Sequence, residues 1–215
     1  MTRTTKKAAA KLNTAIAGAV KRFAPPESLT VDEWADKHRR LSPESSAEAG
    51  PWRTKRTPYL EEPMRAFTDP KVHKIVMVAA SQVGKSELEL NIIGYIIDQD
   101  PGSILYVHPT IDDARKFSRL RVAPMIRDSE PLKAKVHDVK AKDSGNTILQ
   151  KSFPGGMLTL TGSNSASALA STPARYIIGD ERDRWALSAG NEGDPWDLAM
   201  ARQTTFYNAK SGEAK

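Results

Sequence analysis

KIVMVAASQVGKSELELNIIGYIID, residues 74–98, is the stretch that decides the fold. The short apolar run over residues 74–80 is typical of a buried parallel strand. Apolar residues at helical spacing begin at residue 88, so the second half of the stretch predicts a helix. The polar turn between the two completes a strand–loop–helix unit, which is the arrangement found in phosphate-binding loops.

The turn fits the phosphate-loop pattern with one exception, because Ala79 stands where the first glycine belongs. In such a loop, backbone N–H groups surround the phosphates, a lysine reaches the β and γ oxygens, and a serine hydroxyl binds Mg²⁺. The sequence therefore predicts ATP and Mg²⁺ as ligands, with an ordinary strand-to-helix turn as the alternative. The residues expected at the nucleotide are Ser81, Gln82, Val83, Gly84, Lys85 and Ser86.

Two acidic residues follow another apolar run, at residues 174–179. Asp180 would hold Mg²⁺ and Glu181 would orient the attacking water, which is what a nucleotide hydrolase needs opposite its phosphate loop. The alternative is that both acids are simply solvated at the end of a strand, and it would carry more weight without the phosphate loop. Combined with the loop, the pattern predicts that Glu181 and Lys85 are catalytic and that Ser86 and Asp180 bind the metal.

The residues after Glu181 have less specific roles. We expect Asp183 and Arg184 to form a local ion pair, and Trp185 to be a packing residue. A transition state with charge on the γ-phosphate also needs a cation, and the loop itself has no arginine. Candidates for this arginine finger are Arg119, Arg175 and Arg202, unless a neighbouring subunit supplies it.

The remaining patterns alternate between strands and helices. Runs at 103–109 and 155–163 predict further strands, and an amphipathic stretch at 111–126 predicts a helix. Residues 138–156 are polar and carry glycines. The alternation predicts an α/β fold with a largely parallel sheet flanked by helices.

The N-terminal part predicts helices separated by loops. Residues 8–23 have helical spacing, and Thr30 with Glu33 forms a capping-box pattern at the start of a second helix. Residues 42–58 are rich in Ser, Pro and Gly and indicate an extended loop. Residues 59–67 predict a further helix, whose inward face would carry Leu60, Met64 and Phe67.

The composition excludes several classes of protein. The chain of 215 residues is 39% hydrophobic and has no cysteine, so it carries no disulfide, thiolate nucleophile or Cys-ligated zinc. No apolar segment approaches the roughly 20 residues of a membrane helix, and the N-terminus lacks the apolar region of a signal peptide. We expect one medium-sized domain with a tail, no membrane association and a cytoplasmic location.

The net charge of +6 comes from the N-terminal tail, where six cationic residues precede the first acid, Glu27. A second basic stripe lies between residues 115 and 142. Both could contact nucleic-acid phosphates, and both could be solvated surface. The stripe comprises Arg115, Lys116, Arg119, Arg121, Arg127, Lys133, Lys135, Lys140 and Lys142.

Several segments in the same order resemble one family, the large terminase subunits of tailed bacteriophages in the lambda-like branch. The resemblance covers nearly the whole chain, and in this family the phosphate loop commonly departs from its first glycine. The segments are TVDEWADKHRRL, GPWRTKRTPYLEEPM, AASQVGKSE, ILYVHPTIDDARKFSRLRVAPMI, GGMLTLTGSNSASALASTPARYIIGDERD and EGDPWDLAMARQTTF.

The resemblance implies a P-loop NTPase of the ASCE type that uses ATP to drive viral DNA into procapsids. Gly84, Lys85 and Ser86 would be the Walker A residues, and Asp180 and Glu181 the Walker B pair. The implied partners are double-stranded viral DNA, the small terminase subunit, the portal and procapsid, and further copies of the chain. Such motors hold adenine before the first strand, so Tyr59 or Trp52 could stack on the base. For each of these two residues, packing in the hydrophobic core is expected at least as much as stacking on the base.

The resemblance also divides the chain. It implies a basic tail with a short helix over 1–26, a helical and loop segment near the adenine over 27–73, and a P-loop ATPase core over 74–215. The family's ATPase domain continues into a further strand that couples hydrolysis to movement, and then into a nuclease. We therefore expect a C-terminally truncated core without the nuclease. The triplet STP at residues 171–173 resembles the coupling motif, but it precedes the acidic strand.

Two classes of function remain open at this point. The first is a motor ATPase; the second is a truncated, non-catalytic remnant that binds nucleotide, DNA or the small terminase subunit. A helicase-type ATPase would share the loop and the acids, but it would not explain the segments around Trp34, Trp52 and Gly162.

Overall fold

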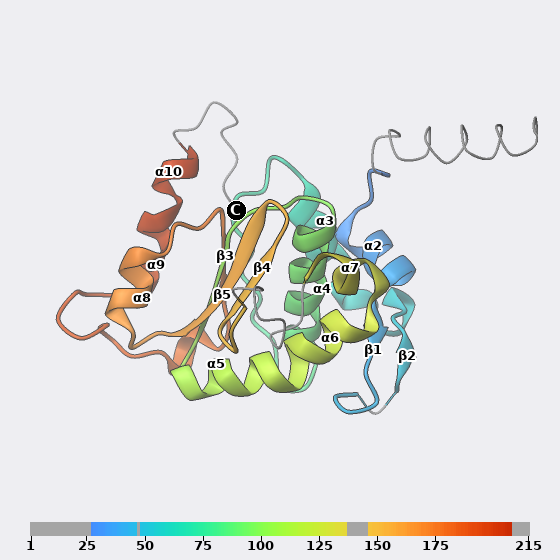
Figure 1. The fold of residues 1–215 in the computed structure, drawn as a ribbon, viewed down its shortest axis with the longest axis horizontal. Coiled ribbons are helices and arrows are strands. Elements are labelled where there is room, and N and C mark those ends of the chain that lie inside the picture. The colour runs from blue at the N-terminus through green and yellow to red at the C-terminus, as the bar shows by residue number, and fades with distance from the viewer. Residues whose placement is uncertain (1–26, 47, 137–145, 208–215) are drawn as a thin grey trace, which may run out of the picture.

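A four-stranded sheet organises the computed structural model, which describes residues 27–46, 48–136 and 146–207 (Figure 1). The strand order is β4-β5-β3-β6. The central strand β3 pairs in parallel with β5 and with β6, whereas β4 pairs with β5 in antiparallel fashion. The strands are β3 (Ile104–His108), β4 (Gln150–Phe153), β5 (Gly156–Gly162) and β6 (Tyr176–Gly179).

Helices cover both faces of this sheet (Figure 1). Tyr106 of β3 belongs to the hydrophobic core on the side of α4 (Lys85–Asp98). Its neighbour Val107 belongs to a second core, which includes residues of α8 (Ala166–Ser171) and α9 (Pro195–Met200). Every residue of β3 is buried, as expected for a parallel strand with both faces covered.

The other elements surround this centre. The N-terminal part contributes α2 (Val31–His38), α3 (Glu61–Thr68) and a short hairpin of β1 (Arg40–Leu41) and β2 (Gly50–Pro51). After β3 come α5 (Ile111–Phe117), the π-helical turn η3 (Ser118–Val122), α6 (Ala123–Asp128) and α7 (Glu130–Lys135). Short 3-10 turns η1, η2, η4 and η5 span Thr54–Arg56, Pro58–Leu60, Arg182–Arg184 and Ala201–Gln203, and α10 spans Thr204–Tyr207.

Most of the predicted elements are present. The strands expected at 103–109, 155–163 and the residues before Asp180 are β3, β5 and β6, and the helix expected after the loop is α4. The capping box is confirmed, since the Glu33 carboxylate accepts a hydrogen bond from the backbone N–H of Thr30 at 2.9 Å. The helix predicted over 8–23 lies outside the described residues.

Two segments contain secondary structure that the sequence did not indicate. The loop expected over 42–58 includes strand β2 and turn η1, and the polar stretch 138–156 includes strand β4. Each of these strands pairs with a neighbour across a short connection. Short strands of this kind are stabilised by their partners rather than by an apolar pattern of their own.

The prediction of a buried strand over 74–80 is wrong. Among the described residues no strand pairs with this segment. Met77 packs partly against the core, but Ile75, Val76 and Val78 are 37%, 70% and 95% exposed. A strand needs a neighbouring backbone for its hydrogen bonds, and β6 is paired on one edge only, with β3. An apolar run alone therefore does not make a strand, because the segment lacks a partner in the sheet.

A close contact between helices places α4 in the core. A Cβ atom on Gly94 of α4 would lie 2.2 Å from the ring of Trp34 in α2, so only glycine fits at this crossing. The indole of Trp34 also donates a hydrogen bond to Asp98 at 2.9 Å. None of the described helices is long and apolar enough to span a lipid bilayer.

Candidate functional site

The 79–86 loop is a tight turn that leads directly into α4. Gln82 and Gly84 both have positive φ angles, of 60° and 86°, and Gly84 is the N-cap of the helix. A left-handed conformation at a non-glycine residue such as Gln82 is uncommon and is often found at binding sites. Alternating left-handed residues curl the backbone so that N–H groups gather on one side, which is the geometry that accepts anions.

Two contacts fix this loop. The ammonium of Lys85 donates a hydrogen bond to the carbonyl oxygen of Ala79 at 3.3 Å and so spans the loop from end to beginning. A Cβ atom on Gly84 would lie 3.3 Å from the side chain of Leu60, which belongs to turn η2 before α3. Turn η2, which lies earlier in the sequence, therefore packs against the loop at Gly84.

The end of β6 carries the predicted acidic pair. The backbone of Asp180 is held on both sides, because its N–H donates to Val107 and its carbonyl accepts from the indole of Trp185 at 2.8 Å. A Cβ atom on Gly179 would lie within 3.0 Å of the rings of Trp185 and Trp196, so the strand end packs closely against both. Trp185 is therefore a packing residue, as predicted, and it also orients Asp180.

Glu181 has a left-handed backbone, with φ of 47°, and its carboxylate pairs with Arg184 across turn η4. The expected pairing of Asp183 with Arg184 is therefore wrong. The turn brings residues three apart onto one side, so Arg184 meets Glu181 instead of its sequence neighbour.

The loop and the strand end lie within electrostatic range of one another. Burial raises the pKa of Asp180, the neighbouring Glu181 raises it further, and the Lys85 ammonium opposes both. Lys85 begins α4 and Asp180 follows β6, so the fold brings the helix N-terminus and the strand end within electrostatic range although 95 residues separate them in the sequence.

Three further polar residues beneath this site were not predicted. The hydroxyl of Tyr106 donates a hydrogen bond to Glu89 at 2.6 Å. Burial raises the pKa of Glu89 to about 8, with the charge of Asp180 adding to this effect. The Nδ1 atom of His108 lies 3.6 Å from a carboxylate oxygen of Asp180, and burial lowers the histidine pKa to about 4, so His108 is neutral at pH 7.

A sequence signal existed for one of these three residues. Glu89 is four residues after Lys85, so both project from the same face of α4, and it is an acid between the apolar residues Leu88 and Leu90. Tyr106 and His108 alternate with the buried apolar residues of β3, and an aromatic residue in a strand is ordinary core.

The arrangement fits a magnesium–nucleotide complex better than a metal bound by protein alone. Within the described part of the chain, no group of three or more His, Asp and Glu side chains is placed to hold a metal ion. Mg²⁺ is commonly bound through one or two protein groups together with substrate phosphates. Asp180 and the hydroxyl of Ser86 would supply those protein groups.

The two aromatic residues considered for stacking on adenine differ in their exposure to solvent. Trp52 is 5% exposed and its indole donates a hydrogen bond to Thr54 at 3.0 Å, so its ring is part of the core. Tyr59 is 55% exposed and directly precedes Leu60, which touches Gly84. Tyr59 is therefore the aromatic residue that remains accessible beside the loop.

Two of the three candidate arginine fingers are engaged by groups away from the site. Arg175 precedes β6, at the opposite end of the strand from Asp180, and pairs with Asp100 at 2.8 Å. Arg202 donates a hydrogen bond to the carbonyl of Ala170. Arg119 lies in η3 with an exposed side chain.

The fold and this site define a class of protein, an α/β domain whose polar residues gather at the carboxyl ends of parallel strands and at one helix N-terminus. Within that class, the chain belongs to the family described as "Phage terminase large subunit gpA, ATPase domain", which it matches over residues 46–212.

Two curated relatives illustrate the similarity. The chain is 32% identical over 131 residues to the terminase large subunit of Escherichia phage lambda, which is 61% of this chain and 20% of the relative. It is 26% identical over 178 residues to that of Enterobacteria phage P21, which is 82% of this chain and 27% of the relative. The chain thus spans about a fifth to a quarter of these relatives. No solved structure matches it.

Proposed function

We propose that this chain binds Mg-ATP and hydrolyses it as the ATPase part of a terminase motor that packages viral DNA into procapsids. The observation that carries the proposal is that Lys85 at the start of α4 lies close enough to Asp180 at the end of β6 for its charge to lower the pKa of that carboxyl. A triphosphate bound at the helix N-terminus would meet Lys85, and its metal ion would meet the carboxylate of Asp180.

Each predicted site residue has a role in this proposal. The backbone of residues 81–84 and the Lys85 ammonium bind the phosphates, and Tyr59 stacks on the base. Ser86 and Asp180 would hold Mg²⁺, which would neutralise charge at the phosphates. Glu181 orients the attacking water once its carboxylate is released from Arg184.

DNA contact is proposed for a part of the basic stripe only. Arg115, Arg127 and Lys135 already pair with Asp112, Asp128 and Asp98. In the described part of the chain, no ion pair engages the cations Lys116, Arg119 and Lys133, and all three are exposed. We assign DNA phosphates to these three cations, and propose the small terminase subunit, the portal and procapsid, and further copies of the chain as the other partners.

A steady-state phosphate-release assay tests the proposal. The unmodified chain should release phosphate from Mg-ATP, and Lys85→Ala should abolish both nucleotide binding and release. Glu181→Gln should bind nucleotide with unchanged affinity but not turn it over, because it removes only the group that orients water. Equal rates in the unmodified chain and in Lys85→Ala would overturn the proposal.

One observation favours a second function, a chain that binds nucleotide or a partner without turnover. The segment before the loop is not anchored in the sheet, and Val76 and Val78 face solvent. A loop without a fixed strand before it can bind phosphates yet position them poorly for reaction. Saturable binding of Mg-ATP without phosphate release would support this second function.

A further inference from the structure

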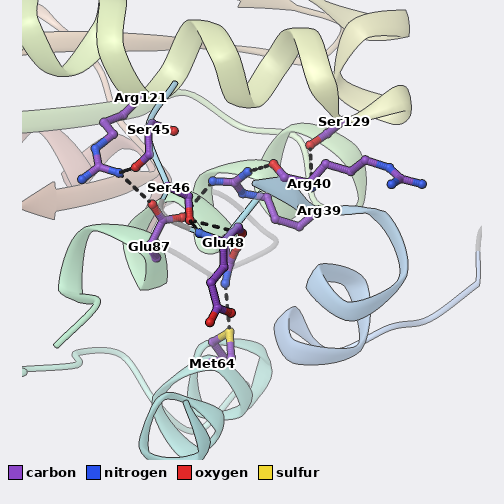
Figure 2. A network of polar contacts seen from close by, with 10 residues as sticks. Arg39, Arg40, Ser45, Ser46, Glu48, Met64, Glu87, Arg121 and Ser129 are labelled. Atoms are coloured by element: carbon purple, nitrogen blue, oxygen red, sulfur yellow. Dashed lines mark hydrogen bonds and ion pairs between the residues drawn. The ribbon is translucent and has the colours of Figure 1, made fainter. Parts of the chain in front are cut away.

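The first turn of α4 contains a carboxylate that neither the nucleotide nor the metal would use. Glu87 directly follows Ser86, and two arginines from distant segments hold its side chain (Figure 2). Nη2 of Arg39 lies 2.9 Å from one carboxylate oxygen, and Nη1 of Arg121 lies 3.2 Å from the other. Arg39 follows α2 and Arg121 belongs to the π-helical turn η3.

The two arginines differ in their freedom to move. The side chain of Arg39 is 3% exposed and also donates to the carbonyl of Arg40, so it is fixed within the fold. The side chain of Arg121 is 38% exposed and donates a second hydrogen bond to the carbonyl of Ser45 at 2.6 Å. Arg121 is therefore the partner that can be replaced without emptying the core.

Charge explains why Glu87 needs two partners. The N-terminus of a helix attracts anions, and the proposed ligand of α4 is a triphosphate. A free carboxylate one residue after Ser86 would repel those phosphates. Two guanidinium groups give the three side chains a net charge of about +1, so the phosphate-binding end of α4 stays positive.

We propose that Arg121 is a positioning residue of the nucleotide site, which keeps Glu87 neutralised beside the phosphate-binding end of α4. The inference rests on the proposed function, because it assumes that α4 receives a triphosphate. It assigns to Arg121 a role other than the nucleic-acid contact that its place in the basic stripe suggested. A π-helical turn such as η3 often marks a functional position in a helix.

Binding of Mg-ATP, Mg-ADP and adenosine to charge variants tests this role. Arg121→Met should raise the dissociation constant of Mg-ATP about five- to tenfold, that of Mg-ADP less, and that of adenosine not at all. Arg121→Lys keeps the charge and should bind nearly as the unmodified chain does. Arg127→Met is the matched control, because Arg127 pairs with Glu44 and Asp128 and not with Glu87.

A second substitution distinguishes charge from loss of structure. Glu87→Gln combined with Arg121→Met removes the repelling carboxylate, so it should restore Mg-ATP affinity to near the unmodified value. Circular dichroism and urea unfolding check that each variant is folded. If the double variant is not folded, the comparison of Arg121→Lys with Arg121→Met still separates loss of charge from loss of structure. Equal loss for all three ligands, or no loss for Mg-ATP, would overturn the inference. If the unmodified chain does not bind Mg-ATP, the proposed function itself fails.

Discussion

At the scale of single residues, the candidate site combines strained backbones with side chains of unusual acidity. Gln82 and Glu181 hold left-handed conformations that cost free energy in any residue other than glycine. Glu89 and His108 lie beneath them with pKa values shifted in opposite directions, toward the neutral form in both cases. Burial explains both shifts, because it penalises whichever form carries a charge.

Glu89 should make folding stability depend on pH. Its pKa is about 8 in the folded chain and near 4.5 when exposed, so between these values the folded chain holds a proton that the unfolded chain releases. Stability should therefore fall as pH rises toward 8, by roughly 1 kcal/mol per pH unit. Glu89→Gln should remove this slope, as measured by urea unfolding at several pH values.

The informative window for this experiment lies between pH 6.5 and about 8. Below pH 6.5 the unfolded chain protonates His108 while the folded chain keeps it neutral, so stability falls as pH decreases. That slope is opposite to the slope from Glu89 and would mask it. The exposed residue Glu192 provides a control, because Glu192→Gln should leave the profile unchanged. If Glu89→Gln showed the same pH dependence of stability as the unmodified chain, Glu89 would not be its cause.

At the scale of elements, the sequence predicted best where a complete local pattern existed. The strands β3, β5 and β6 and the helix α4 each carry their own apolar pattern, and each formed where expected. The 74–80 segment carries an equally clear pattern, but a strand also needs a neighbour, and no sequence window contains that information. Motifs predicted Lys85, Asp180 and Glu181 as site residues. The approach of Glu89 and His108 to them depends on strand order.

The close crossing of α2 and α4 should make the fold sensitive to the size of residue 94. Gly94→Ala places a methyl group against the buried ring of Trp34, where the structure leaves 2.2 Å. Despite the higher helix propensity of alanine, we expect a net loss of about 1–3 kcal/mol in the free energy of unfolding, measured with urea.

A double variant tests whether the clash with the indole is the cause of this loss. Trp34→Phe together with Gly94→Ala replaces the larger ring, so the pair should cost less than the sum of the two single variants. Strict additivity would mean that the loss arises elsewhere in α4.

At the scale of the whole molecule, Ile75, Val76 and Val78 form an exposed apolar strip outside the sheet. Large apolar side chains that lie next to one another at the surface promote association or dye binding. The strip directly precedes the 79–86 loop, so association there would also obstruct the candidate site.

Replacing the two valines of this strip with threonine, which has a similar shape, should reduce association. We expect the chain carrying Val76→Thr and Val78→Thr to scatter less light at high concentration and to bind less hydrophobic dye. Its free energy of unfolding should change by no more than about 0.5 kcal/mol, since the positions are exposed. Val107→Thr, in buried strand β3, is the contrasting control and should destabilise the fold. Unchanged scattering in the double variant would show that another surface causes association.

The hydrogen bond from Trp185 to the carbonyl of Asp180 has a spectroscopic consequence. An indole fixed against the metal-binding candidate should change its fluorescence emission when charge arrives beside that carboxylate. The chain has four tryptophans, and both Trp34 and Trp52 are buried outside this site, so they contribute a steady background. We therefore expect the intrinsic fluorescence of Trp185 to report occupancy of the proposed site without an attached label.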